Sequence, residues 1–364
     1  MFLTNKLAVM TLANSWPEIL GKLLQKQPLD RAEANWAMTQ IMAGDASDSQ
    51  VGAFMLALRS KGETVDELAG LVDIMLRKAV ILDTGNDAVD IVGTGGDMVG
   101  TVNISSMASI LTAAAGVPVM KHGSRSASGK TGSSEMLEVL GIRLDLSPER
   151  VADVFREVGI TFFFAPVFHP AMRYVAPIRR ELGVPTTFNF LGPLANPAQP
   201  IATSLGVANP FIAPLMAAEM AARGRTALVF RGSDGLDELT TTGTSHIWQV
   251  SGGVVTEFDL DPADLGLPRA SVADLVGGDA HFNAQVARMV LGKETPDRNL
   301  DAVRDIVVLN AAGGVVAYEL AKDASQAKLS INERFAAAIS KVRDALDSGA
   351  AAEKLSAWIA ATQA

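Results

Sequence analysis

The chain has 364 residues, 48% of them hydrophobic and 20% charged, which is the composition of an ordinary globular protein with one large or two medium-sized domains. Its formal net charge of −9 and its pI near 5.0 argue against nucleic acid as a partner, because nucleic-acid binding needs a basic surface. There is no cysteine, so disulfides, zinc–thiolate sites and a thiol nucleophile are excluded, and a cytoplasmic location is expected. The sequence has no apolar run of about 18 residues and no signal-peptide pattern, so we expect no membrane partner.

Residues 16–84 are predicted to contain helices only. Capping-box patterns pair Asp30 with Glu33 and Thr64 with Glu67, and apolar residues recur at helical spacing between them. Each helix therefore carries a single apolar stripe. This pattern predicts a small helical bundle packed against a larger body.

From residue 88 onward, strand-like runs alternate with helix-like runs. This alternation predicts an α/β fold with a mostly parallel central sheet flanked by helices. Ligands of such sheets lie at the carboxyl ends of the strands. The alternation lapses between about 166 and 200, in a proline-rich stretch of helical fragments, and residues 257–267 are predicted to be irregular. The predicted strands are 89–92, 117–120, 160–164, 204–207 and 227–231, and the later helices are 280–291, 303–321 and 332–348.

Two loops rich in glycine and in hydrogen-bond donors each follow a predicted strand and precede a predicted helix. The first contains Gly93, Gly95 and Gly96, and the second covers residues 121–134. Free backbone N–H groups and the helix dipole favour an anion at such positions. Two neighbouring loops of this kind suit a substrate with two separated phosphate groups, and the alternative is a pair of ordinary turns with serine caps. Further donors are Asn103, Ser105, Ser106, Lys121, Arg125, Ser126, Ser128, Lys130 and Ser133.

Two familiar phosphate-binding motifs do not fit these loops. The dinucleotide fingerprint G-x-G-x-x-G needs glycine at position 98, where this chain has Met98. The P-loop pattern is approached by Gly123 and the run Gly129-Lys130-Thr131, but one residue too many separates the two glycines. Both motifs are therefore excluded.

Acidic residues follow the last predicted parallel strand in the run Asp234-Gly235-Leu236-Asp237-Glu238. Adjacent carboxylates opposite two anion-binding loops favour a hard cation such as Mg²⁺, which commonly bridges one or two carboxylates to substrate phosphates. A solvated acidic turn is the alternative. The four histidines lack metal-ligand spacing. Arg173, Arg179 and Arg180 form a cluster in which any one residue is able to bind a carboxylate.

The combination of motifs resembles the anthranilate phosphoribosyltransferases. The shared motifs are GTGGD at 93–97, T-x-N-I-S at 101–105, KHG-x-R at 121–125, the H-P-A-M-R to L-x-N-P segment at 169–197 and DGLDE at 234–238. Later matches are Gly277-Gly278-Asp279, Asn283 and Leu309-Asn310-Ala311-Ala312. The resemblance covers the chain from about residue 17 to about residue 350.

This resemblance implies transfer of the phosphoribosyl group of phosphoribosyl pyrophosphate (PRPP) to the amino group of anthranilate, a step of tryptophan biosynthesis. It implies the nucleoside phosphorylase and phosphoribosyltransferase type of fold, with a helical domain of residues 1–84 plus about 166–198 and an α/β domain of residues 85–165 plus 199–364. A homodimer is also expected. In this family's pattern, PRPP would contact Gly93, Gly96, Asp97, Thr101, Asn103, Ile104, Ser105, Ser106, Lys121, His122, Gly123, Ser124, Arg125, Ser126, Ala127, Ser128, Gly129 and Ser133.

The resemblance also assigns the acceptor and the metal. Anthranilate would lie near Gly93, His122 and Ser124, with its carboxylate on Arg179. Mg²⁺ would bind Ser105, Asp237 and Glu238. No general base is assigned, because the aromatic amine is neutral. Catalysis would instead depend on electrostatic stabilisation by Lys121 and by the metal.

Several positions depart from the family pattern, and they keep other functions open. Ser124 stands where asparagine is usual, Met98 and Gly129 replace a usual glycine and a usual serine, and residues 295–300 lengthen a loop. The alternatives are a transferase for another aromatic amine and a pyrimidine nucleoside phosphorylase, although the lysine–histidine–serine strand end of the latter is absent. A polyanion-binding paralogue without enzymatic activity is the remaining alternative.

Overall fold

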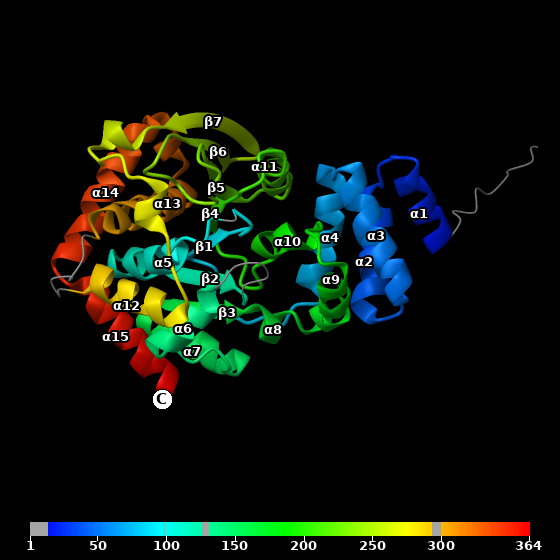
Figure 1. Cartoon of the computed structure of the whole chain (residues 1–364), viewed down its shortest axis with the longest axis horizontal. Helices are drawn as coiled ribbons and strands as arrows, with labels where there is room; N and C mark the ends of the chain where they lie inside the picture. The colour runs from blue at the N-terminus through cyan, green and yellow to red at the C-terminus, as the bar shows by residue number, and fades with distance from the viewer. Residues whose placement is uncertain (1–13, 98, 126–130, 293–299) are drawn as a thin grey trace, which may run out of the picture.

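The computed structural model describes residues 14–97, 99–125, 131–292 and 300–364, and it contains a helical lobe beside a larger lobe built around a sheet (Figure 1). The predicted capping boxes are confirmed: Asp30 accepts a hydrogen bond from the Glu33 N–H at 2.8 Å, and Thr64 accepts one from the Glu67 N–H at 3.3 Å. The helices at the start of the chain are α1 (Trp16–Leu24), α2 (Arg31–Ala43), α3 (Asp48–Lys61) and α4 (Val65–Arg77).

The larger lobe contains a seven-stranded sheet in the order β3-β2-β1-β4-β5-β6-β7. Neighbouring strands are parallel from β3 to β5, whereas β6 and β7 are antiparallel, so the predicted mostly parallel sheet is confirmed. The strands are β1 (Val89–Gly93), β2 (Val119–Gly123), β3 (Ile160–Phe164), β4 (Ala202–Gly206), β5 (Thr226–Gly232), β6 (Ser245–Ser251) and β7 (Val254–Leu260).

The sequence analysis missed the hairpin of β6 and β7, and the prediction that residues 257–260 are irregular was wrong. Most side chains of β7 are exposed or partly exposed, so the strand lacks the apolar run used to recognise the others. Its partner β6 is buried on both faces over much of its length. The turn between them is Gly252-Gly253, and both glycines have positive φ.

Two predicted strands are displaced along the chain. The structure places Lys121, His122 and Gly123 on β2, whereas the sequence analysis placed them in the following loop. The apolar run ends at Met120, but the strand continues because the polar side chains of Lys121 and His122 are also buried. Strand β4 likewise begins two residues before the predicted start at Ser204.

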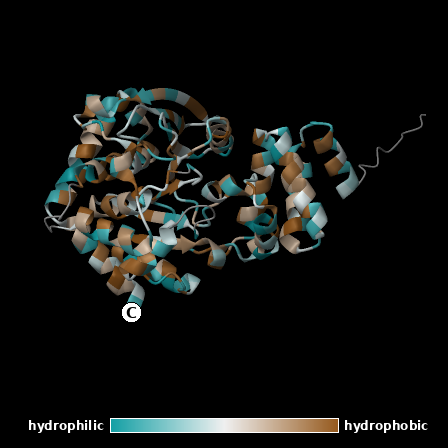
Figure 2. Cartoon of the chain, in the orientation of Figure 1, coloured by the Kyte–Doolittle hydropathy of each residue, from teal (hydrophilic) through white to brown (hydrophobic). Residues whose placement is uncertain are grey.

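Helices cover both faces of the sheet. Side chains that alternate along a strand point into different cores: Ile91 packs in the core with α5 and α13, whereas Val92 packs in a core shared with α11 and the helical lobe. Apolar residues are brown on the helices of both lobes in Figure 2. The helices are α5 (Ile104–Ala114), α6 (Ser133–Leu140), α7 (Pro148–Val158), α11 (Ala213–Ala222), α12 (Ala280–Leu291), α13 (Asp301–Lys322), α14 (Ile331–Asp347) and α15 (Ala350–Gln363), and neither α11 nor α15 was among the predicted helices.

The segment after β3 returns to the N-terminal helices. The 3₁₀ helix η1 packs on α2, α9 packs on α3, and α10 packs on α4. Among the described residues, none of the helices combines the length and the apolar character needed to span a bilayer. The elements of this segment are α8 (Ala165–Phe168), η1 (Pro170–Tyr174), α9 (Ala176–Leu182), α10 (Phe188–Leu191) and η2 (Gly192–Leu194), and the later 3₁₀ helices are η3 (Pro262–Leu265), η4 (Val272–Leu275) and η5 (Ala324–Lys328).

Candidate functional site

The order of the strands reverses between β1 and β4. The chain leaves β1 for α5 on one face of the sheet and leaves β4 for α11 on the other face. In an open sheet of this kind, the carboxyl ends of two such strands form the usual ligand-binding position. The first glycine-rich loop, residues 93–97 (the glycine loop), begins at this position.

The glycine loop is held at its start and is open further on. The Thr94 N–H donates to the Gly206 carbonyl at 3.0 Å, and the Gly95 N–H donates to Oδ2 of Asp237 at 2.7 Å. Gly96 has φ of 87°, a left-handed conformation that other residues adopt only with strain. Asp97 is partly buried, and its side chain accepts the Val99 N–H at 3.2 Å.

The acidic turn, residues 234–238, lies between the tips of β1 and β4. A Cβ atom on Gly93 would be 2.2 Å from Oδ2 of Asp237, and a Cβ atom on Gly206 would be 1.7 Å from the Asp237 carbonyl oxygen. Only glycine at these two strand ends leaves room for the turn. The glycine loop and the acidic turn, which are far apart in the sequence, therefore form one structure.

Burial and mutual repulsion act on the carboxylates of this turn. Burial raises the pKa of Asp237 to about 6, and the negative charge of Asp97 adds to the shift. Burial and the neighbouring Asp237 raise the pKa of Glu238 well above its usual range, although Lys121 and the backbone N–H of Ser105 oppose this shift. Carboxylates gathered without an equal number of cations are stabilised in the ionised form by a metal ion.

The donor set fits Mg²⁺. No group of three or more histidine, aspartate or glutamate side chains arranged to hold a metal occurs in the described part of the chain. Mg²⁺ needs no such group, because it keeps several waters and commonly takes only one or two carboxylates from a protein. Asp237, which is bonded to the glycine loop, and Glu238, which lies beside Ser105, would supply two hard oxygen ligands.

Lys121 is buried on β2 near the acidic turn and does not lie on the surface of the second predicted loop. Its side chain is buried, and Nζ donates to the Ile91 carbonyl and to Oγ of Ser105, the latter at 3.3 Å. Burial lowers the pKa of Lys121, and the nearby carboxylates of Asp90 and Glu238 oppose the shift. Nζ of Lys121 thus lies buried close to the carboxyl groups of Asp90 and Glu238.

The start of α5 lies beside the acidic turn. Asn103 occupies the N-cap position, and the Ser105 N–H lies against Glu238. Ile104 and Ser106 are buried, and Oγ of Ser106 has no hydrogen-bond partner among the described residues. Thr101, just before the helix, forms a β-bridge with Val276.

The second predicted loop begins at the end of β2. A Cβ atom on Gly123 would be 2.9 Å from Oγ of Ser133, so the strand end and the first residue of α6 are in close contact. Ser124 is exposed, and the exposed Arg125 donates to Glu138 at 2.9 Å. The predicted contacts at 126–129 lie outside the described residues, as do Met98, Lys130 and most of the lengthened loop at 295–300.

Two histidines that are distant in the sequence meet at the junction of the lobes. The rings of His122 and His169 have centroids 5.1 Å apart. Nδ1 of His122 lies 3.1 Å from the Gly192 carbonyl, and Nε2 of His169 lies 2.9 Å from the Ala195 carbonyl. Burial lowers the pKa of His122 to about 3 and that of His169 to about 4, so both rings are neutral at pH 7.

Of the three clustered arginines, only Arg179 is partly buried. It lies on α9 and donates to Oδ1 of Asn189 at 3.3 Å, and burial lowers its pKa. Arg173 is exposed and stacks on Tyr174, with 4.8 Å between its guanidinium carbon and the ring centroid, and Arg180 is exposed. Arg179 is therefore the member of the cluster placed in a sheltered position.

Three buried polar residues that support this site received no role from the sequence. Asp90 accepts the His122 N–H at 3.1 Å and an N–H of Asn196 at 2.8 Å. Asn310 on α13 accepts the Leu239 N–H at 2.9 Å and donates to the Leu239 carbonyl at 2.8 Å, directly after the acidic turn. A single polar residue within an apolar run is the signal that marks Asp90 and Asn310.

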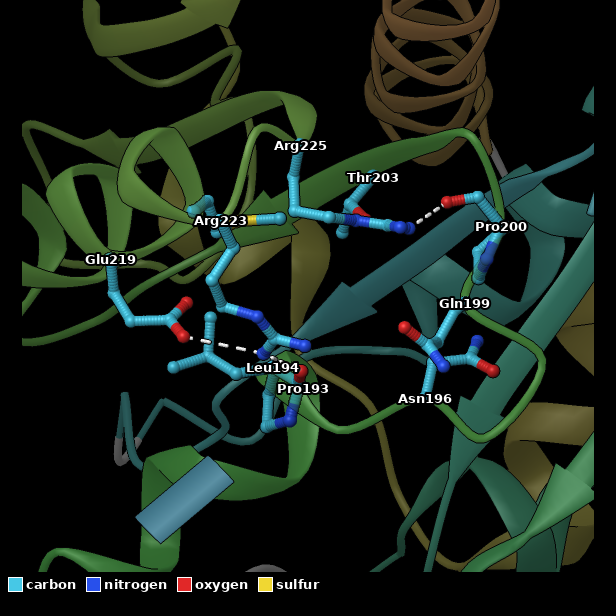
Figure 3. A pocket seen from close by; sticks show the side chains of 10 residues that line it. Pro193, Leu194, Asn196, Gln199, Pro200, Thr203, Glu219, Arg223 and Arg225 are labelled. Atoms are coloured by element: carbon cyan, nitrogen blue, oxygen red, sulfur yellow. Dashed lines mark hydrogen bonds and ion pairs between the residues drawn. The ribbon is translucent and has the colours of Figure 1, made fainter. Parts of the chain in front are cut away.

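A separate pocket lies at the opposite ends of the strands. It is lined by residues before or at the start of β4 and β5, among them Pro200, Thr203 and Arg225 (Figure 3). Arg223 donates there to the buried Glu219 at 3.2 Å. The carboxylates and the glycine loop lie at the carboxyl ends, so this pocket is not the candidate site.

Comparison with known proteins agrees with this arrangement. Residues 17–79 match the helical bundle domain, and residues 85–352 match the a/b domain, of a glycosyl transferase family. Fold and site together define a glycosyl transferase built from a helical bundle and an α/β domain, and the predicted fold class is confirmed.

The particular family follows from individual relatives. The chain is 55% identical over 355 residues to the anthranilate phosphoribosyltransferase of Leifsonia xyli subsp. xyli, covering 97% of this chain and 100% of the relative. The crystal structure of the Thermus thermophilus enzyme has a TM-score of 0.84 at 38% identity, covering 95% of this chain and 99% of that one. The Saccharomyces cerevisiae enzyme in complex with PRPP and Mg has a TM-score of 0.84 at 25% identity, covering 96% and 98%. The chain belongs to the anthranilate phosphoribosyltransferase family, as the sequence motifs predicted.

Proposed function

We propose that this chain transfers the phosphoribosyl group of PRPP to the amino group of anthranilate, giving N-(5-phosphoribosyl)anthranilate and pyrophosphate in tryptophan biosynthesis. The observation that carries the proposal is the acidic turn between the tips of β1 and β4, with Asp237 bonded to the glycine loop and Glu238 at the start of α5. This arrangement offers a metal ion and backbone N–H donors to the same polyanion.

PRPP would lie along the glycine loop, the first turn of α5 and the start of α6. Asp237 and Glu238, with Ser105, would hold Mg²⁺, which when bound would neutralise charge on the pyrophosphate. Departure of pyrophosphate develops negative charge on the leaving group, and donors fixed in place before the reaction stabilise such charge most effectively. Lys121 adds a positive charge behind the loop and, through Ser105, keeps the α5 hydroxyl in place.

Anthranilate would be held between the lobes. Arg179 would bind its carboxylate, and Gly93, His122 and Ser124 would lie near the ring. The neutral state of His122 suits a neutral aromatic amine, which needs no strong base. The rate would then depend on positioning the amine behind the carbon that pyrophosphate leaves.

The same proposal includes the predicted division of the chain into two domains. The helical domain consists of residues 1–84 plus about 166–198, and the α/β domain consists of residues 85–165 plus 199–364. This division is supported by the packing of α9 on α3 and of α10 on α4. Closure of the two parts would exclude water and limit hydrolysis of PRPP. We also propose that the protein works as a cytoplasmic homodimer without nucleic-acid or membrane partners.

The test is the loss of anthranilate fluorescence on mixing the protein with PRPP and Mg²⁺, repeated with EDTA. Fluorescence loss that requires both PRPP and the metal supports the proposal. Substituted aminobenzoates in place of anthranilate examine whether Ser124 admits another aromatic amine. Phosphorolysis of a pyrimidine nucleoside in the absence of any anthranilate turnover would contradict the proposal.

A further inference from the structure

A buried asparagine of α12 contacts the N-cap residue of α5. Asn283 is 2% exposed, and its Nδ2 donates to Oδ1 of Asn103 at 2.9 Å. Its own Oδ1 accepts the Gly278 N–H at 2.8 Å. Asn283 therefore connects a backbone amide on one side to the candidate phosphate-binding residue on the other.

The direction of this chain of hydrogen bonds is determined by its first member. An asparagine amide can be turned either way, but a backbone N–H only donates, so the Gly278 N–H requires Oδ1 of Asn283 to face it. Nδ2 of Asn283 must then face Asn103, which must present its own Oδ1. The Nδ2 group of Asn103 is consequently turned away from Asn283.

That Nδ2 group remains available to a ligand. Its contact in the described part of the chain is the Thr131 carbonyl at 3.5 Å, which is long for a hydrogen bond. Asn103 stands at the N-terminus of α5, where an anion is favoured. An N–H donor there adds to the attraction, whereas a carbonyl oxygen in its place repels an anion.

The backbone around Gly278 is itself fixed. The Gly277 N–H donates to the Gly100 carbonyl at 2.9 Å, and the Val102 N–H donates to the Leu275 carbonyl at 3.0 Å. A Cβ atom on Gly277 would be 2.8 Å from Oδ1 of Asn283, so glycine permits the close approach. Residues 275–278 thus run along residues 100–102, and the Gly278 N–H does not turn freely.

We propose that Asn283 is a positioning residue that orients the Asn103 amide so that Nδ2 faces the phosphorylated substrate. The inference rests on the proposed function, because it concerns binding of PRPP. It assigns a role to Gly277, Gly278 and Asn283, which lie more than 170 residues beyond the glycine loop and are among the motifs shared with the family.

Two substitutions at one position separate orientation from packing. Asn283→Asp keeps the acceptor for the Gly278 N–H but presents an oxygen to Asn103, so the Asn103 amide must turn and place Oδ1 toward the substrate. Asn283→Ala removes both hydrogen bonds, so the Asn103 amide is free to adopt either orientation. We expect Asn283→Asp to raise the Kd and KM for PRPP about 10- to 100-fold, the range for a hydrogen bond to a charged group, and Asn283→Ala to raise them less. The KM for anthranilate stays within about twofold of wild type.

A purely structural role predicts the reverse order, with Asn283→Ala the more damaged variant. The readout is calorimetric binding of PRPP in the presence of Mg²⁺, together with KM and kcat. Thr161→Val is the matched control. It removes one buried hydrogen bond, from Thr161 on β3 to the Val151 carbonyl, on the side of β2 away from β1. Binding of PRPP to this variant is expected to be unchanged.

The added negative charge of Asn283→Asp is separated from orientation by repeating it in an Asn103→Ala background. The orientation effect requires Asn103, so in that background the further loss of PRPP affinity falls to less than about threefold. A loss that persists in full there, or equal PRPP binding by wild type and Asn283→Asp, overturns the inference and leaves the proposed function standing. If wild type itself takes up no PRPP, it is the proposed function that fails.

Discussion

The acidic turn and the glycine loop lie against each other, but the fold holds them differently. The turn is enclosed by contacts with its surroundings. Asp234 accepts hydrogen bonds from Thr240 and Thr242, both at 2.5 Å, and Asn310 pairs with the N–H and the carbonyl of Leu239. Gly206, which has no side chain, allows the backbone of Asp237 to lie directly against β4. In the glycine loop, a Cβ atom on Gly96 would meet no described atom within 4 Å. One side of the site is therefore held by packing and hydrogen bonds, and the other is open.

This difference matches the tasks proposed for the two segments. Ligands of a small hard cation must be held in place, because Mg²⁺ demands near-ideal geometry. A loop that surrounds a polyanion instead has to admit it and then close. Packing and hydrogen bonds of the α/β lobe therefore hold the acidic turn in place. The shape of the glycine loop depends instead on its own backbone conformation.

The largest effect is expected from Gly206→Ala. The new methyl group would lie 1.7 Å from the Asp237 carbonyl oxygen, so the acidic turn or strand β4 must move. We expect the free energy of unfolding to fall by about 3 kcal/mol or more, with loss of transferase activity. Urea unfolding measures the change. Gly21→Ala, in open space on α1, is the control and is expected to be neutral or stabilising; a stable, active Gly206→Ala protein would contradict the enclosed description of the turn.

Asn310→Ala is expected to come next. It leaves the buried N–H and carbonyl groups of Leu239 unpaired, at a cost of about 2–3 kcal/mol in unfolding free energy. Because Leu239 follows Glu238 directly, the Mg²⁺ concentration for half-maximal activity should rise. Val308→Ala, a buried truncation on the same helix, is the comparison. An equal shift in Mg²⁺ dependence for both variants would mean that general destabilisation is the cause.

Asp237→Asn should stabilise the metal-free protein while abolishing activity. The pKa of Asp237 is raised from 3.8 to about 6, so the folded state binds more protons than the unfolded state between these values, and stability falls as the pH rises through that window. Asparagine does not ionise, so the variant does not lose stability as the pH rises. It should therefore be more stable than wild type at pH 7 by on the order of 1–3 kcal/mol. Thermal unfolding in EDTA at pH 4 and pH 7 measures it, and a gain of equal size at both pH values would argue against the titration of Asp237.

Gly96→Ala is expected to have the smallest effect on stability. The substitution costs about 1 kcal/mol because φ is 87°, but the new methyl group meets nothing. The KM for PRPP should nevertheless rise, since the loop conformation places its N–H groups. Unfolding and steady-state kinetics on the same preparation separate the two quantities. Destabilisation as large as that of Gly206→Ala would mean that the loop is as tightly packed as the turn.

Much of the site followed from local pattern. The strand–loop–helix units around Gly93 and Lys121 were predictable, because an apolar run, a cluster of glycines and a helix start are all local signals. The extent of β2 was not predictable, because Lys121 and His122 are polar residues in a buried strand. Their hydrogen-bond partners, Asp90 for the His122 N–H and Ile91 and Ser105 for Lys121, come from other segments. The hairpin of β6 and β7 was missed because an edge strand with exposed side chains has no apolar signature.

By itself the sequence determined the class of fold, the family and the order of the chemical groups along the chain, because these depend on composition, periodicity and motif spacing. Only the tertiary structure decided which of those groups meet. It placed Asp237 between two strand tips, paired His122 with His169, and connected Asn283 to Asn103. Such contacts join residues from distant segments, and they exist only after strand order and helix packing have brought those segments together.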